Sequence, residues 1–362
     1  MVAAVGGRRV MRMLATTAAT TAAVVLVAGC GVRTTPAKAT ELTFVSSGGV
    51  VQQAMVNAWQ TPYRDVRPGI RFVNTSPPDV AQVKAQVEAG AVGWNIVAVP
   101  PGHAIENCGT LYEKLTVPGL DDDQFAPGTH GECFVAVLRY SVVFSYNTER
   151  WPDPETAPKT VADFFDVERF PGKRGVAATL TDGVLEWALL ADGVDPASLY
   201  PLDIDRALAK WESIRDHTTW TATADELLGL VRSEDLDMQL LLQPHTLVAI
   251  DREVPIAPVW DVTLTNVSGL AIPRGSAYIE HALQFLSFVL QPEQQSRIAE
   301  VAGVDPVNRD ADPTRSVNSN SVNAFGPANT GTTVAIDQQW WGQNWAAAVA
   351  RFHAWRNPPP EA

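Results

Sequence analysis

The first third of the chain alternates between apolar runs of strand length and apolar residues at helical spacing. From Val51 to Trp59, large apolar side chains recur four residues apart, which predicts a helix. Asn95 to Val99 is apolar on both faces, as in a buried strand of a parallel sheet. The expected strands are 41–45, 70–74 and 95–99, and the expected helices are 51–59 and 79–89. Strands that alternate with helices predict an α/β lobe.

The alternation resumes at residue 134 and predicts a second α/β lobe. Two strand-like runs flank Arg139, and the segment from Ile279 to Leu290 carries the apolar stripe of an amphipathic helix. Pro292 and Gly303 are placed to begin and end the next helix. The other expected strands are 175–178, 247–250, 257–260 and 269–273, and the other expected helices are 160–165, 182–190, 203–217 and 337–355. A chain of 362 residues is long enough for two such lobes.

The first 29 residues have the pattern of a secretory signal. Arg8, Arg9 and Arg12 precede an uncharged stretch that ends in Leu-Val-Ala-Gly before Cys30. This ending resembles the bacterial lipoprotein box, which predicts a lipidated Cys30 followed by a polar tether to residue 40. An ordinary signal peptide with a chance cysteine is the alternative. We expect an exported protein anchored to the outer face of the cell membrane, because no later run of 18 apolar residues could span it.

Net charge argues against nucleic acid as a partner. The sequence has 40 acidic and 27 basic residues, for a formal charge of −13, and a nucleic-acid binder should carry a basic face. The acidic balance does not identify a partner, because acidic surfaces also keep proteins soluble.

Two further cysteines, Cys108 and Cys133, remain after Cys30. An exported protein meets an oxidising environment, so a disulfide is the natural interpretation. Two buried thiols or a metal pair assisted by His103 and His130 are the alternatives.

Catalytic signatures are missing from the sequence. It contains no G-x-S-x-G, no P-loop, no G-x-G-x-x-G and no H-E-x-x-H. We therefore expect a protein that is not an enzyme and that carries no cofactor and no metal.

The turn Ser46-Ser47-Gly48-Gly49 follows the first expected strand and precedes a helix. Backbone N–H groups and two hydroxyls meet there, which favours a site for an anionic or polar ligand group. The alternative is a tight turn in which serine caps the helix.

Tryptophan and acidic residues supply the other candidate ligand contacts. Trp220 and Trp260 stand near the ends of expected elements and offer rigid faces for a ligand or cation, although packing is the alternative. Glu186 lies one helical turn after Asp182, so both could point into a cleft, or both could simply favour the positive end of a helix. Asp261 is a candidate cation partner or turn cap.

The order of several motifs resembles the extracellular solute-binding proteins of ABC importers, in the branch that includes spermidine/putrescine-binding proteins. The similarity spans about Glu41 to Trp355. The motifs are LTFVSSGG (42–49), ADFFD and FPGKR (162–174), LEWALLADG (185–193), LAIPRGS (270–276), PEQQ (292–295) and PVN (306–308).

The resemblance implies an α/β, two-lobed, type II periplasmic-binding-protein fold, with a mixed sheet flanked by helices in each lobe and a hinge around a cleft. The first lobe would comprise residues 41–138 and 266–315, and the second 139–265 and 316–356. A small-molecule ligand would bind in the cleft, and the protein would then dock on an ABC permease in the membrane.

The site is where the chain departs from polyamine binders. Asn266 and Ser268 stand where those relatives have Trp and Asp, Leu242 replaces another Trp, and Glu186 is the only clear carboxylate match. We keep Asn266 as a candidate contact and expect a polyamine-like or other small organic solute. A non-transport descendant acting as a sensor or envelope lipoprotein is the main alternative, and an exported hydrolase is a weaker one.

Overall fold

The computed structural model describes residues 39–126 and 129–357. The predicted signal peptide, Cys30 and residues 31–38 of the expected tether lie outside the described residues. Within the described part, no helix is both long and apolar enough to cross a membrane.

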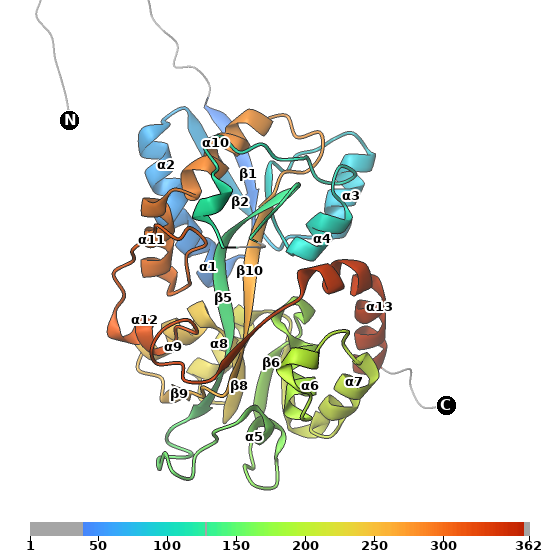
Figure 1. Ribbon diagram of the computed structural model, residues 1–362, viewed down its shortest axis with the longest axis vertical. Coiled ribbons are helices and arrows are strands. Elements are labelled where there is room, and N and C mark those ends of the chain that lie inside the picture. Colours follow the sequence, from blue (N-terminus) through green and yellow to red (C-terminus); the bar gives the residue numbers. More distant parts are fainter. Residues whose placement is uncertain (1–38, 127–128, 358–362) are drawn as a thin grey trace, which may run out of the picture. The chain divides into compact units, whose positions relative to one another are not determined.

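Two groups of helices and strands form two lobes, joined by two long strands (Figure 1). The first lobe contains β1 (Thr40–Val45), α1 (Gly49–Met55), the π-helical turn η1 (Val56–Gln60), α2 (Thr61–Val66), β2 (Ile70–Thr75), α3 (Val80–Glu88), β3 (Ile96–Val99), α4 (Pro101–Glu106), η2 (Asp122–Gln124), β4 (His130–Gly131), α10 (Ile279–Val289) and α11 (Pro292–Ala302). The second lobe contains α5 (Val161–Phe165), β6 (Arg174–Ala177), η3 (Leu180–Asp182), α6 (Val184–Ala191), η4 (Pro196–Ser198), α7 (Ile204–Glu212), η5 (Arg215–His217), β7 (Thr218–Thr221), α8 (Ala224–Arg232), β8 (Met238–Leu242), α9 (Gln243–Asp251), β9 (Ile256–Pro258), α12 (Val317–Ser321), β11 (Thr332–Ala335) and α13 (Gln338–Arg356). The strands β5 (Phe134–Asn147) and β10 (Val262–Ala271) run through both lobes.

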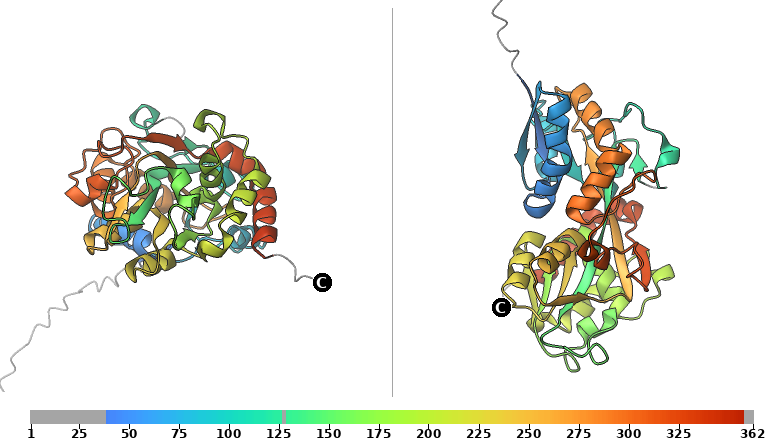
Figure 2. Two further views of the ribbon diagram at one scale, coloured as in Figure 1. Left: turned by 90° about the horizontal axis from the view of Figure 1, so that it is seen from below. Right: turned by 90° about the vertical axis from the view of Figure 1, so that its left-hand side faces the viewer.

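The strands form one mixed sheet in the order β2-β1-β3-β10-β5-β8-β6-β7. In the first lobe β1 is parallel to β2 and β3, and in the second β6 is parallel to β7 and β8. The central pair β5 and β10 is antiparallel, and it carries the sheet from one lobe to the other (Figure 2).

Each lobe has its own apolar core. Phe44, Trp59 and Phe285 are buried together in the first lobe, and Trp187 and Trp211 in the second. The expected lobe boundaries, 41–138 with 266–315 and 139–265 with 316–356, stay a prediction.

Local signals placed several elements correctly. The Asp79 carboxylate caps α3 by accepting a hydrogen bond from the Ala81 N–H at 2.8 Å. Gly303 ends α11 with a φ of 70°, a left-handed conformation that suits glycine. Cys108 and Cys133 form a disulfide, which confirms the expected pairing.

Some expected elements differ in the structure. The strand predicted for 247–250 is wrong, because these residues lie inside α9, which begins with Pro244 in its first turn after the strand β8. A short apolar run does not separate a buried strand from a buried helix. The helix expected over 203–217 ends at Glu212, and the two runs around Arg139 are one continuous strand, β5.

Candidate functional site

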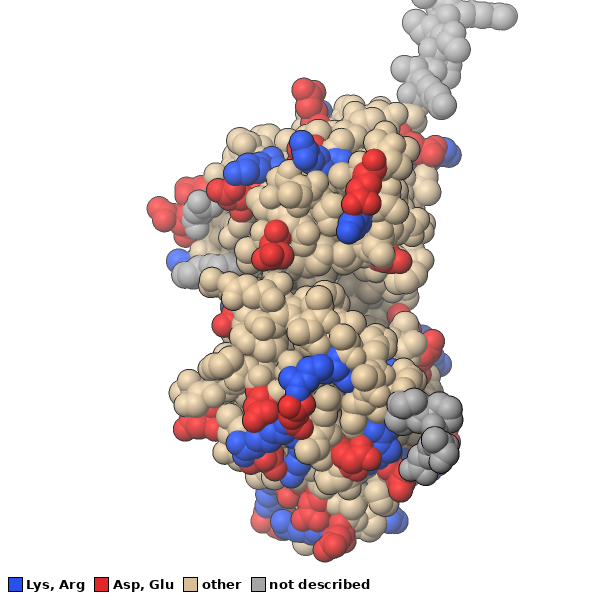
Figure 3. Space-filling view, turned by 90° about the vertical axis from the view of Figure 1, so that its right-hand side faces the viewer, with Lys and Arg blue, Asp and Glu red and all other residues tan. Residues whose placement is uncertain are grey.

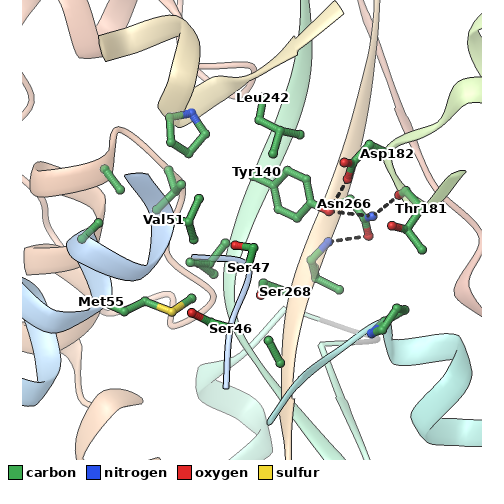
Figure 4. Close-up of a pocket in the computed structure, with 18 of the residues that line it drawn as sticks. Ser46, Ser47, Val51, Met55, Tyr140, Thr181, Asp182, Leu242, Asn266 and Ser268 are labelled. Carbon is green, nitrogen blue, oxygen red and sulfur yellow. Dashed lines mark hydrogen bonds between the residues drawn. The ribbon is translucent and has the colours of Figure 1, made fainter. Parts of the chain in front are cut away.

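A cavity of about 220 Å³ lies between the lobes, beside the central strands β5 and β10 (Figure 4). The loops that follow β1 and β3 approach it from the first lobe, and η3 and the start of α9 approach it from the second. The lining residues used below are Ser46, Ser47, Val51, Met55, Leu138, Tyr140, Thr181, Asp182, Leu242, Asn266, Ser268 and Ile298.

Most of the wall is apolar. Val51 and Met55 come from α1, Leu138 from β5, Leu242 from the end of β8 and Ile298 from α11. Such a wall binds hydrocarbon groups through burial, at roughly 25 cal/mol per Å² of apolar surface removed from water.

Polar groups converge on one side of the cavity. The Tyr140 hydroxyl donates to Asp182 Oδ1 at 3.0 Å, and Asn266 Nδ2 donates to the Tyr140 oxygen at 3.1 Å (Figure 4). Asn266 Nδ2 also donates to the Thr181 carbonyl at 2.7 Å. Because Tyr140 and Asn266 are paired in register on β5 and β10, the sheet itself sets the geometry of this network.

Burial dominates the electrostatics of the network. It raises the pKa of Asp182 from its ordinary 3.8 to about 6, and the hydrogen bond from Tyr140 opposes the rise. Burial also raises the pKa of Tyr140 well above 10, and the neighbouring Asp182 charge adds to this rise. Tyr140 is therefore a neutral donor at neutral pH, whereas Asp182 is a carboxylate with no cationic partner among the described residues.

The cavity lining is unbalanced in charge. Of the described residues that line it, Asp182 alone is acidic and none is Lys, Arg or His. A buried carboxylate without a compensating charge is costly, and a cationic ligand group would relieve that cost. The arrangement therefore suits a small ligand with a positive group and an apolar body.

Ser46 adds a second polar point on the first-lobe side. Its side chain is buried, and its Oγ has no hydrogen-bond partner among the described residues. A buried hydroxyl without a partner is unusual in a folded protein, so it is available to a ligand.

The turn after β1 already holds a carboxylate of the protein. Asp225 Oδ1, from α8 in the second lobe, accepts a hydrogen bond from the Val50 N–H at 3.1 Å. A Cβ on Gly49 would lie 1.9 Å from the Asp225 carboxylate, and both Gly48 and Gly49 have positive φ, so glycine is required here. His245 Nε2 lies 3.5 Å from the same oxygen. Asp225 thus occupies the Val50 N–H, whereas the ligand contacts expected of Ser46, Ser47, Gly48 and Gly49 stay a prediction.

Some predicted contacts meet in the structure. Ser46, Ser47 and Asn266 line one cavity, and Gly48 and Gly49 complete the turn beside it.

The other four predicted contacts lie outside this lining. Glu186 is buried in α6, where its Oε1 accepts from the Tyr200 hydroxyl and from Trp341 Nε1, each at 2.7 Å. Burial raises the pKa of Glu186 to about 7. Trp220 packs on Trp211 with ring centroids 4.9 Å apart. Contact with a ligand stays a prediction for Glu186 and Trp220, and likewise for Trp260 and Asp261.

Trp260 and Asp261 lie just before β10. Trp260 is half-buried, and the Asp261 carboxylate accepts from the Val161 N–H at 3.0 Å, which ties the start of β10 to the start of α5.

No sequence pattern singles out Tyr140, and Asp182 is marked only by its position one helical turn before Glu186. The position of Tyr140 in mid-strand, opposite Asn266, was a usable signal only once the pairing of β5 with β10 was known. No group of three or more His, Cys, Asp or Glu residues that could hold a metal ion occurs in the described ranges.

Comparison with known proteins agrees with this architecture. The family model for bacterial extracellular solute-binding proteins matches residues 69–326. A gamma-aminobutyric acid-binding protein of Pseudomonas aeruginosa is 30% identical over 328 residues, which cover 88% of this chain and 92% of that protein.

Two solved structures give the same picture. A GABA receptor structure is 29% identical with a TM-score of 0.78, covering 89% of this chain and 99% of that one. An ABC transporter substrate-binding protein from Bradyrhizobium japonicum USDA 110 is 27% identical with a TM-score of 0.76, covering 88% of this chain and 100% of that one. These structures confirm the expected α/β periplasmic-binding-protein fold. Two of the three relatives are named for GABA, and none is named for a polyamine. The chain therefore belongs to the bacterial extracellular solute-binding proteins, is the substrate-binding protein of an ABC transporter, and binds a small organic solute rather than acting as an enzyme.

Proposed function

We propose that this protein captures a small solute with a cationic amine on a short apolar body, with GABA as the first compound to test, and delivers it to a membrane permease. The observation that carries the proposal is the Asp182 carboxylate, which faces an apolar cavity whose described lining has no basic side chain.

The amine end of the ligand is assigned to Asp182. An ammonium group that replaces water beside a buried carboxylate gains both a charge partner and hydrogen bonds. Tyr140 stays neutral and hydrogen-bonded to Asp182 Oδ1, so it orients the carboxylate rather than competing for it.

The carboxylate end of an ω-amino acid is assigned to the hydroxyls on the first-lobe side. Ser46 Oγ has no other partner in the described part of the chain, and Ser47 lines the same cavity. Between the two ends, Val51, Met55 and Leu138 supply an apolar wall for methylene groups. The GABA-binding relatives support this choice of ligand.

A diamine fits less well. Its second ammonium would need a second acid, and Asp182 is the only acidic residue among the described lining residues. We therefore rank polyamines below amino acids with one amine.

The test is isothermal titration at pH 8 with four compounds of similar length: GABA, butylamine, butyrate and putrescine. We expect GABA to bind best, butylamine to bind more weakly and butyrate not to bind. Asp182→Asn should abolish GABA binding, whereas Asp216→Asn, which removes an exposed acid outside the cavity, should not change it. Binding of butyrate as tight as that of GABA would contradict the assignment. A folded protein that binds none of the four would favour the sensor or envelope role.

We also propose that the mature chain is exported and held at the membrane by a lipid on Cys30. The support is the family and the sequence before Cys30. Mass spectrometry of the membrane fraction should find a diacylated N-terminal peptide that Cys30→Ser removes. A Cys30→Ser chain that stays in that fraction would argue against the anchor.

A further inference from the structure

Two glycines from different lobes meet backbone to backbone at the edge of the cleft. A Cβ on Gly102 of α4 would lie 2.2 Å from the Gln338 carbonyl oxygen and 2.7 Å from the Gly342 nitrogen of α13. A Cβ on Gly342 would lie 2.5 Å from the Gly102 carbonyl oxygen. Neither glycine has a positive φ, so the requirement for glycine comes from the approach of the partner backbone alone. We call this pair the glycine contact.

The two helices belong to separate cores. Ala104 of α4 is buried with Tyr112 and Phe134 in the first lobe, whereas Trp341 and Phe352 of α13 are buried in the core of the second. In Figure 1, α13 stands beside the second lobe and its first turns lie below α4. In Figure 3, seen from that side, uncharged surface predominates between the lobes while charged side chains gather above and below it. The glycine contact is therefore a contact between lobes.

One side chain connects the glycine contact to the cavity. Gln338 Oε1 accepts from the Gly102 N–H at 3.4 Å, and Gln338 Nε2 donates to Asn266 Oδ1 at 2.7 Å. Asn266 lines the cavity and donates in turn to Tyr140, the partner of Asp182. The glycine contact, Gln338 and the polar side of the cavity therefore form one continuous hydrogen-bonded path.

A glycine in this position works against helix formation. Gly342 lies inside the long helix α13, where alanine would favour the helix more strongly. The missing side chain of Gly342 instead allows the backbone of α4 to lie against α13. This contact can form only when the two lobes are together.

We propose that the glycine contact is the point at which the two lobes lock when they close, and that Gln338 is a positioning residue that couples this lock to the occupied cavity. The second part rests on the proposed function, because it assumes that the solute occupies this cavity. Apparent affinity falls in proportion to the fraction of molecules able to reach the binding-competent arrangement, so blocking the contact should weaken solute binding without touching the cavity.

The test compares Gly342→Ala with Gly229→Ala in the full chain. A Cβ on Gly229 of α8 would meet nothing within 4 Å, so this variant makes the same helix substitution without a steric block. Circular dichroism and thermal melting first establish that both variants are folded.

Hydrogen exchange without any ligand examines the contact itself. We expect amides of residues 102–107 to exchange at least tenfold faster in Gly342→Ala than in the wild type, and at the wild-type rate in Gly229→Ala. Wild-type exchange rates in a folded Gly342→Ala chain would overturn the proposal.

Titration with GABA then examines the coupling. We expect the Kd to rise at least tenfold in Gly342→Ala and to change less than twofold in Gly229→Ala. Gln338→Glu keeps an acceptor for the Gly102 N–H but loses the donor to Asn266. It should therefore keep the ligand-free protection and lose the extra protection that GABA produces at residues 102–107. Full GABA-induced protection in Gln338→Glu would refute its positioning role. A wild-type chain that does not bind GABA would refute the proposed ligand, and the ligand-free exchange would still decide the lock.

Discussion

Replacing Glu186 with Gln tests the electrostatic reasoning most sharply, because this acid is fully buried next to the site yet outside the cavity. Its pKa is raised from 4.5 to about 7, mainly by burial, while hydrogen bonds from Tyr200 and Trp341 oppose the rise. A group with a raised folded-state pKa adds stability that is complete below its unfolded pKa and is lost as the pH rises through its folded pKa.

The size of the effect follows from the shift. A rise of roughly 2.5 pKa units, at 1.36 kcal/mol per unit, corresponds to about 3 kcal/mol of unfolding free energy, as an upper figure. This stability should be present near pH 4.5 and absent at pH 8. Glutamine keeps the oxygen that accepts from Tyr200 and Trp341 and does not titrate. Glu186→Gln should therefore gain stability relative to the wild type as the pH rises.

The assay is urea unfolding between pH 4.5 and pH 8 for the wild type, Glu186→Gln and the exposed control Asp216→Asn. We expect the difference between Glu186→Gln and the wild type to grow by about 2–3 kcal/mol over this range. We expect no such growth for Asp216→Asn. Parallel curves for Glu186→Gln and the wild type would refute the assignment of a raised pKa to Glu186.

Three further predictions concern binding and stability. GABA affinity should fall about tenfold per pH unit below pH 6, because protonation of Asp182 removes the charge that holds the amine. Titration calorimetry between pH 4.5 and pH 8 measures this dependence, and an affinity that does not change with pH would exclude Asp182 as the partner of the amine. Asp225→Ala should raise the Kd for GABA about fivefold, because it removes the acceptor of the hydrogen bond from the Val50 N–H, which contributes about 1 kcal/mol between the lobes. An unchanged Kd would mean that this hydrogen bond does not contribute to lobe closure. Replacing Cys108 and Cys133 with serine should lower the unfolding free energy by about 3 kcal/mol, as expected for a closed loop of this length. Urea unfolding measures this loss, and an unchanged urea midpoint would show that the disulfide does not constrain the unfolded chain.

The parts of the fold that depend on local signals could be predicted from the sequence. The cap at Asp79, the proline and glycine that bound α11, and the strand β1 followed by its glycine turn all stand where the pattern placed them. The run at 247–250 failed because an apolar stretch of four residues carries no period, and the preceding strand β8 decides that the chain turns into a helix there.

The site was harder to predict because its polar side depends on strand register and on the end of the chain. Tyr140 and Asn266 are 126 residues apart and meet only because β5 and β10 pair. Asp182 and Glu186 have helical spacing, yet Asp182 faces the cavity while Glu186 is covered by Trp341, which lies 155 residues further along. No local pattern reveals which of the two acids is covered.

A crystal structure of the protein with GABA tests the central claim most directly. The account predicts the amine nitrogen within about 3 Å of the Asp182 carboxylate, the carboxylate of GABA near the Ser46 hydroxyl, and Gly102 in backbone contact with Gly342. A ligand bound with its carboxylate toward Asp182, or with its amine held by other residues, would contradict the account.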